Sequence, residues 1–242
     1  MHQTVAIAYC GPAAAPSDLL TRWNLDPSLI TALVVLAISI VRGRAVNARA
    51  GWVALVLMAV IFMSPLCALA SALFSARVLH HVLLICAVAP LLAVAFPMRR
   101  FPQQPLALLV GLNAIVLWVW HMPGPYEWGL ASVLTYWLMQ ATLLGSAWLL
   151  WRAILATTAQ PGPALVALVA TIGQMGLLAA LIVFAPRALY PVHFATAEAW
   201  GMSPLTDQQL AGLLMWVPAQ LPYLGLGMWL AWSSLRRFEP TP

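Results

Sequence analysis

Long apolar runs dominate the chain, and short polar segments interrupt them at intervals. Seven runs approach or exceed the roughly 20 residues that an α-helix needs to cross a hydrocarbon layer. They are residues 28–45, 50–69, 73–96, 104–122, 132–152, 163–185 and 208–235. A membrane β-barrel requires alternating strands of about ten residues, which these unbroken runs do not resemble. The pattern predicts an all-α fold, a polytopic membrane helix bundle with seven transmembrane helices.

The ends of the chain differ from this central part. Residues 1–26 carry only a short apolar patch without a preceding basic segment, so they do not resemble a signal peptide. We interpret them as a mobile N-terminal periplasmic tail. Residues 27–237 form the predicted seven-helix domain, and residues 238–242 form a short cytoplasmic tail.

Charge is scarce, and its placement predicts the orientation. Only 7% of the residues are charged, against about 25% in soluble domains. Arginines occur in alternate connections, at Arg42, Arg44, Arg49, Arg99, Arg100, Arg152, Arg236 and Arg237. Because basic connections stay in the cytoplasm, the N-terminus is predicted outside and the C-terminus inside a bacterial inner (plasma) membrane. Scattered arginines of this kind do not form a nucleic-acid-binding patch.

This orientation brings potential metal ligands to the outer face. His80 and His81 lie in the outer half of the third run, and His121 lies at the outer end of the fourth. Cys67 and Met63 belong to the second run, and Met122 follows His121. Thiolate and thioether sulfur select Cu(I), and imidazole also binds copper, so copper is the metal that this set suits. The alternative is a set of packed, hydrogen-bonded interface residues.

Arg77 argues against a metal on its own helix face. It precedes His80 and His81 by three and four residues, and such residues share a face. Its permanent positive charge repels a metal ion. The side chain is interpreted either as a snorkelling interfacial arginine or as the partner of Glu127, Asp207 or a lipid phosphate.

Two further stretches combine polar and aromatic residues. In residues 118–130 a helix containing Trp120 ends near His121, and Tyr126 stands at the level of an aromatic belt. In residues 205–218, Thr206 is the predicted N-cap, and Asp207 follows at the positive end of the helix. Gln208 needs partners inside a membrane, and Gly212 permits close helix packing.

Other chemistry is not indicated. The three cysteines, Cys10, Cys67 and Cys86, show no metal-binding spacing. The sequence allows a disulfide between any two of them but does not indicate one. Nucleotide-binding, hydrolase and metalloprotease motifs are absent from the sequence, so we predict that the protein is not an enzyme and identify no small-molecule substrate.

The chain resembles the caa3-type CtaG family, seven-span assembly factors of cytochrome c oxidase, over most of residues 20–237. The resemblance lies in SPL at 64–66, LFSA followed by His81 at 73–81, LWVWHMPGPYEWGL at 117–130 and DQQLAGLLMWVP at 207–218. It implies a role in assembling the copper-containing part of a haem–copper oxidase, with oxidase subunits and membrane lipids as partners.

The resemblance divides the candidate ligands. His81 and His121 match histidines of the family pattern, whereas the family commonly has histidines where this chain has Cys67 and Arg77. In the fifth run the family pattern has a His-x-x-Glu-His arrangement, and this chain has Tyr136, Met139 and Gln140 at the corresponding positions. The fold and the cellular context are therefore implied more fully than a complete copper site.

The leading hypothesis is a membrane factor that assists oxidase assembly, or copper delivery, at the periplasmic face. Its metal ligands would be His81, His121 and Cys67, with His80, Met63 and Met122 secondary. Structural or interaction roles fall to Arg77, Asp207, Gln208, Trp120 and Tyr126. One alternative is a stably bound accessory subunit without a metal, and a further one is a haem-binding membrane protein with His81 and His121 as axial ligands.

Overall fold

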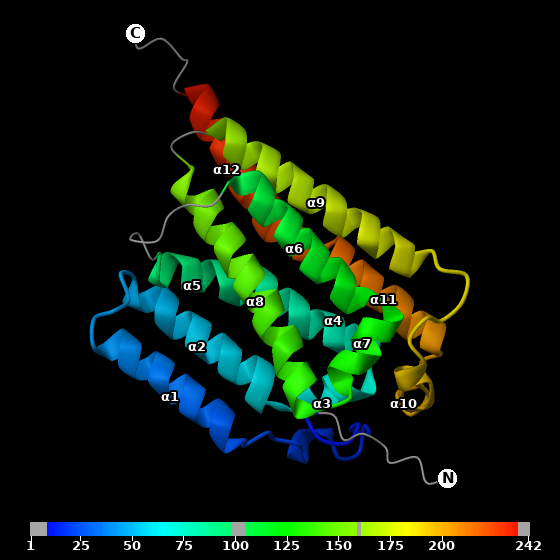
Figure 1. Ribbon diagram of the computed structural model, residues 1–242. Coiled ribbons are helices and arrows are strands. Elements are labelled where there is room, and N and C mark those ends of the chain that lie inside the picture. Colours follow the sequence, from blue (N-terminus) through cyan, green and yellow to red (C-terminus); the bar gives the residue numbers. More distant parts are fainter. Residues whose placement is uncertain (1–8, 98–104, 159–160, 237–242) are drawn as a thin grey trace.

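The computed structural model describes residues 9–97, 105–158 and 161–236, and this part of the chain is helical without strands (Figure 1). The predicted all-α class is thus confirmed. The elements are η1 (Leu19–Thr21), α1 (Pro27–Val41), α2 (Ala48–Met63), α3 (Pro65–Ala72), α4 (Phe74–Leu83), η2 (Leu84–Val88), α5 (Ala89–Ala95), α6 (Leu106–His121), α7 (Pro123–Leu130), α8 (Val133–Ala156), α9 (Pro161–Val183), η3 (Pro191–His193), α10 (Phe194–Glu198), α11 (Pro204–Trp216), η4 (Pro218–Gln220) and α12 (Leu221–Arg236). The predictions for Arg99, Arg100, Arg237 and the terminal segments 1–8 and 238–242 lie outside the described residues.

Several of these helices are suited to cross a membrane. Four segments are long and apolar enough, namely Phe74–Ala95, Val133–Ala156, Pro161–Val183 and Pro204–Arg236. The bent pairs α2–α3 and α6–α7 raise the number to six if each pair is one span. Helix α1 is apolar but only 15 residues long. The chain is therefore a multi-pass membrane protein, whereas seven crossings and the N-out/C-in orientation stay predictions.

Proline sets the two bends. Helices α2 and α3 meet at 50°, and α6 and α7 meet at 77°. Pro65 and Pro123 stand at the first positions of α3 and α7, where the missing N–H group would have had no helical partner. Each proline disfavours helical geometry in the residue before it, so the preceding helix ends there.

A π-helical turn separates α4 from α5. Pro90 has no N–H group, and its ring would collide with a carbonyl group one turn earlier in a regular α-helix. The wider turn η2 accommodates the ring. The Trp151 indole of α8 donates to the carbonyl oxygen of Ile85 at 3.0 Å. This carbonyl group would otherwise face the proline without a donor.

Helix α11 packs against both α4 and α9. Gly212 permits the second contact, because a Cβ atom there would lie 3.0 Å from the carbonyl oxygen of Ala179. The close packing predicted for Gly212 is thus confirmed. The predicted N-cap of this helix was wrong: Ser203 caps it, accepting from the Thr206 backbone N–H, since Pro204 already occupies the first helical position.

One end of the bundle gathers the short elements. Figure 1 shows α3, α7 and α10 near the beginning of the described chain, whereas α12 ends at the opposite end. Residues 9–26, here called the strap, lie at the first of these ends. The strap is held by the bundle: Asn24 donates its backbone N–H to the Met63 carbonyl oxygen at 2.9 Å, and Trp200 donates to the Ala14 carbonyl oxygen at 3.0 Å. The expectation of a mobile tail was therefore wrong for residues 9–26.

Candidate functional site

A cluster of buried polar side chains, here called the outer cluster, lies inside the bundle next to the strap. Helix α4 contributes three of its members, α6 contributes one from its last turn, and α8 contributes two. Its members are Arg77, His80, His81, His121, Tyr136 and Gln140, and each is at most 4% exposed. The structure thus brings together the histidines predicted on the third and fourth runs. The ring centroids of His81 and His121 are 5.8 Å apart.

Asp207 fixes the helix that carries most of this cluster. Its carboxylate on α11 accepts hydrogen bonds from the backbone N–H groups of Phe74 and Ser75, at 2.7 and 3.0 Å, and from the Ser75 hydroxyl. The carboxylate therefore caps α4, not the helix to which it belongs. A negative charge at a helix N-terminus also offsets the positive end of the helix dipole. The sequence pattern placed Asp207 at the positive end of its own helix, whereas its hydrogen bonds go to the N-terminus of α4.

Gln208 joins α11 to the end of α9. Its amide donates to the Ile182 carbonyl oxygen at 3.0 Å, and its oxygen accepts from the Leu189 backbone N–H at 2.6 Å. The need for partners that the sequence suggested is thus met by backbone groups. Gln208 is 1% exposed, and its role is structural.

His121 retains one free ring nitrogen. Its Nδ1 lies 2.7 Å from the Leu117 carbonyl oxygen, which can only accept, so Nδ1 carries the proton. Nε2 then has a lone pair, and it has no hydrogen-bond partner in the described part of the chain. A metal-binding histidine typically has this arrangement, with one ring nitrogen oriented by a carbonyl group and the other available.

His81 is less well prepared to bind a metal. Its Nε2 lies 3.3 Å from the Gln140 Nε2, which donates to it, so Nδ1 carries the proton. In this orientation neither nitrogen offers a lone pair. Rotating the Gln140 amide by 180° would turn its oxygen to the ring and free Nδ1 as a ligand. The Gln140 Oε1 atom has no partner among the described residues, so the rotation breaks no bond of that oxygen.

The other predicted sulfur and nitrogen ligands do not complete a metal centre. Cys67 forms a disulfide with Cys10 and offers no thiolate in this state. The Met122 residue is 53% exposed, and His80 packs edge-on against Phe62 at 4.9 Å between ring centroids. Within the described ranges, no three His, Cys, Asp or Glu side chains are grouped to hold a metal ion. The residues present fit two-coordinate Cu(I) at His81 and His121 at most, and not a Zn(II) centre with three or four ligands.

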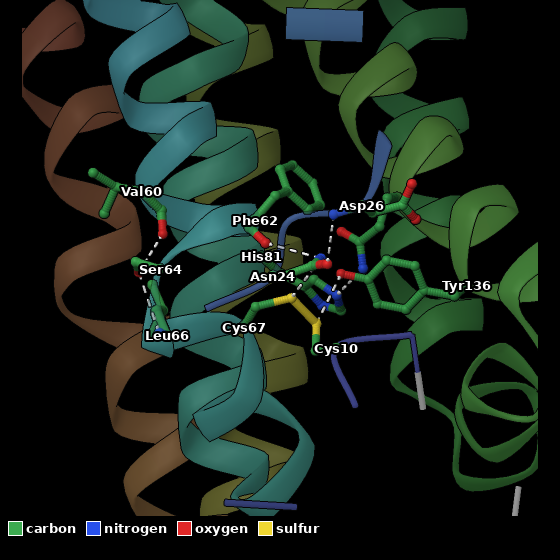
Figure 2. Close-up of a disulfide and its surroundings, with 11 residues drawn as sticks. Cys10, Asn24, Asp26, Val60, Phe62, Ser64, Leu66, Cys67, His81 and Tyr136 are labelled. Atoms are coloured by element: carbon green, nitrogen blue, oxygen red, sulfur yellow. Dashed lines mark hydrogen bonds between the residues drawn. A yellow bond between two sulfur atoms is a disulfide. The ribbon is translucent and has the colours of Figure 1, made fainter. Parts of the chain in front are cut away.

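The disulfide ties the strap to the start of α3 beside the outer cluster (Figure 2). Cys10 and Cys67 are separated by 57 residues. The Tyr136 hydroxyl donates to the Cys10 Sγ at 3.7 Å, and Asn24 donates to the Cys67 Sγ at 3.8 Å. The Tyr9 ring stacks on the Tyr136 ring with centroids 4.7 Å apart. The strap thus covers Tyr136, a member of the outer cluster.

Arg77 is buried without a charge partner in the described part of the chain. Its side chain is 0% exposed, and its three nitrogens have no hydrogen-bond partner among the residues described. The guanidinium carbon lies 5.3 Å from the centroid of the Tyr136 ring, a cation–π distance. An isolated buried charge costs several kcal/mol even after relaxation. The interpretation as a snorkelling interfacial arginine is therefore wrong.

A second hydrogen-bonded group lies next to the cluster. The Tyr126 hydroxyl donates to His193 Nε2 at 2.7 Å, and His193 Nδ1 donates to the Ala72 carbonyl oxygen at 3.2 Å. Burial, with a contribution from the Arg77 charge, lowers the pKa of His193 to about 4. The structural or interaction role of Tyr126 stays a prediction. The Trp120 indole donates to the Thr142 hydroxyl at 2.8 Å.

Sequence reasoning missed the covering layer of this site. Cys10, Tyr9 and Asn24 belong to the segment predicted to be mobile. One signal was available: Cys10 and Cys67 are both predicted on the outer side, where disulfides form readily. Tyr190, whose hydroxyl donates to the His121 carbonyl oxygen at 2.7 Å, carried no comparable signal.

The fold and the outer cluster define a multi-pass membrane helix bundle with a buried polar site near one end. The model of the cytochrome c oxidase caa3 assembly factor family (Caa3_CtaG) matches residues 34–237, and the chain belongs to this family. The resemblance found in the motifs is thus confirmed. Comparison with curated proteins and with solved structures gives no match.

Proposed function

We propose that this protein assists the assembly of a caa3-type cytochrome c oxidase at the periplasmic face of the bacterial inner membrane. The observation that carries the proposal is the family match, which covers residues 34–237 and includes the whole outer cluster. An assembly factor interacts with the oxidase and needs no catalytic machinery of its own. The predicted orientation places the outer cluster at the periplasmic face.

Within this function, copper is the cargo that the outer cluster suits. His121 supplies a lone pair on Nε2, and His81 supplies a second one once the Gln140 amide rotates. Two neutral imidazoles match the preference of Cu(I) for few, soft or borderline ligands. Cys67 would join them only after reduction of its disulfide.

Pull-down from native membranes, combined with metal analysis, tests both parts. We expect tagged protein to retain oxidase subunits while the oxidase is being assembled, and reduced protein to bind Cu(I) in competition with a chromophoric chelator. Normal oxidase levels in a deletion strain would contradict the assembly role. Failure to bind Cu(I) would contradict only the proposal that copper is the cargo. An absorption spectrum of the same sample tests the haem-binding alternative, which requires a Soret band.

A second candidate is a permanent accessory subunit without a metal. It is favoured by the guanidinium of Arg77 inside the cluster and by the oxidised state of Cys67. In that case the protein would co-purify with the mature oxidase in constant ratio. Release of the protein before the oxidase is active would exclude this candidate.

A further inference from the structure

The charge of Arg77 lacks a counter-ion in the described part of the chain. All three nitrogens of its guanidinium group are buried, and among the described residues none has a partner in good hydrogen-bond geometry, although the Tyr126 and Tyr136 hydroxyls lie near the group. The group has five N–H donors and no acceptor. A charge in this position, within a membrane protein, marks a functional site by default.

The carboxylates of the described residues are all engaged elsewhere or exposed. Asp18 pairs with Arg22 at 2.6 Å, and Asp26 caps α1 through the Ser28 backbone N–H. The Asp207 oxygens are occupied by the N-terminus of α4. Glu127 and Glu198 are exposed at the surface. The pairings of Arg77 with Glu127 or Asp207 that the sequence suggested are thus absent from residues 9–97, 105–158 and 161–236.

The local charge balance is positive. The N-terminus of α4 carries roughly half a positive charge, and Arg77 adds a full one three residues after Phe74. Asp207 supplies one negative charge at the same helix end. About half a positive charge is left over in an environment from which water is excluded.

The groups that share this environment are neutral or hydrogen-bond donors. His80 lies one turn after Arg77 on the same helix face, and neither of its ring nitrogens has a partner within the described ranges. The Tyr136 ring faces the guanidinium group. The Arg77 charge repels a metal cation, and together with the unpartnered His80 ring it favours an acceptor with a negative charge.

We propose that Arg77 and His80 form a binding site for a small monovalent inorganic anion such as chloride. The guanidinium and imidazole N–H groups would replace the hydration shell of the ion, and the ion would neutralise the excess charge. The size is limited because Arg77, His80 and Tyr136 are all 0% exposed. The strap covers Tyr136 and is held by the Cys10–Cys67 disulfide (Figure 2), so a small ion fits this position better than a carboxylate inserted by another protein.

This site adjoins the copper-binding pair, since the ring centroids of His80 and His81 are 5.9 Å apart. His80 and His81 are neighbours in sequence and therefore point about 100° apart around the helix. Both lie about one turn after Arg77, and the His81 ring also faces His121. The anion proposal rests on Arg77 and His80 and does not require copper at His81 and His121.

The test uses the full-length protein in detergent or nanodiscs. Protein purified in chloride is passed rapidly through a desalting column into sodium gluconate and unfolded at once, and released chloride is measured by ion chromatography. We expect about one chloride per chain. In parallel, thermal unfolding is followed while chloride or bromide replaces gluconate at constant ionic strength. A saturable rise in the unfolding temperature is expected.

Variants assign the effect to the site. Arg77→Met should release no chloride and lose the halide dependence, whereas the exposed Arg42→Met keeps both. If Arg77→Met does not fold, the wild-type measurements decide by themselves. No released chloride together with equal unfolding temperatures in chloride and gluconate would overturn the proposal. So would an oxidase carboxylate bound to Arg77 in a structure of the complex determined in the presence of chloride.

Discussion

Two sets of buried polar side chains lie side by side in this bundle. One set has hydrogen-bond partners for its buried oxygens, and the other leaves several nitrogens without partners. Asp207 and Gln208 on α11 have partners for their buried oxygens, all of them on neighbouring helices or loops. In the outer cluster, Arg77 and His80 have no side-chain hydrogen bond within the described residues, and His81 and His121 each keep one ring nitrogen without a partner.

The difference separates folding from function. A satisfied buried group stabilises the arrangement that satisfies it, so Asp207 and Gln208 position α4 and α9. An unsatisfied buried group lowers stability and calls for an explanation, such as a ligand or an ordered water molecule. We therefore assign the first set to the scaffold and propose ligands for the second set, copper at His81 and His121 and an anion at Arg77 and His80.

The largest expected effect concerns the cap of α4. Replacing Asp207 by Asn removes the charge and turns an amide N–H group toward backbone donors. Hydrogen bonds to charged groups contribute about 1.5–3 kcal/mol each, so we expect a loss of at least about 3 kcal/mol in unfolding free energy. Thermal or denaturant unfolding in nanodiscs measures it, with the exposed Glu198→Gln as the control. A loss no larger than in that control would show that Asp207 does not hold α4.

The next effect concerns the disulfide that holds the strap. Closing a loop of 57 residues stabilises a fold by about 2–4 kcal/mol. Cys10→Ser and Cys67→Ser should each lower the unfolding temperature to the value of the reduced wild type. Reductant should then have no further effect on the double variant. Different values for the two single variants would argue against a shared bond.

A smaller effect appears on acidification. The folded state holds the pKa of His193 at about 4, against an ordinary value of 6.5. Above pH 6.5 both states leave His193 neutral, whereas at lower pH the unfolded chain binds a proton that the folded chain does not. The unfolding free energy should therefore decrease as the pH is lowered below 6.5, by about 1.4 kcal/mol per pH unit from this residue.

The matched variant for this pH dependence is His193→Gln, which does not titrate. Between pH 6.5 and pH 5 the wild type should lose about 2 kcal/mol more than the variant. The comparison isolates His193 from the other histidines. Equal slopes in the two proteins would show that His193 does not contribute.

The fold was largely predictable because apolar runs of this length have few alternatives in a membrane. Helices lie in all seven predicted runs, and Pro65 and Pro123 mark the observed bends. The bend angles were not predictable, because packing between distant helices sets them. The π-helical turn before Pro90 also depends on a distant residue, Trp151.

The site was predictable only in its local part. The spacing of Arg77, His80 and His81 indicated a polar helix face, and topology brought His121 to the same end. The partners that decide the chemistry come from distant positions, since Asp207 caps a helix 132 residues earlier in the chain. Cys10 likewise lies 126 residues from Tyr136. No local pattern encodes such contacts, so the covering strap and the burial of Arg77 required the structure.

The central claim is that the outer cluster, whose polar groups lack partners, acts in function, whereas Asp207 and Gln208, whose oxygens have partners, act in folding. His121→Asn tests it most directly, because the Asn amide keeps the donor to the Leu117 carbonyl oxygen and removes Nε2. The control is Gln208→Met, which removes two backbone contacts at similar size.

The decisive measurement is the amount of assembled, copper-loaded oxidase per folded copy of each variant in a deletion strain. His121→Asn should keep its unfolding free energy within about 1 kcal/mol of the wild type and lose oxidase assembly. Gln208→Met should lose about 2 kcal/mol and keep full assembly per folded copy. Normal assembly with His121→Asn, or a specific loss with Gln208→Met, would contradict the account.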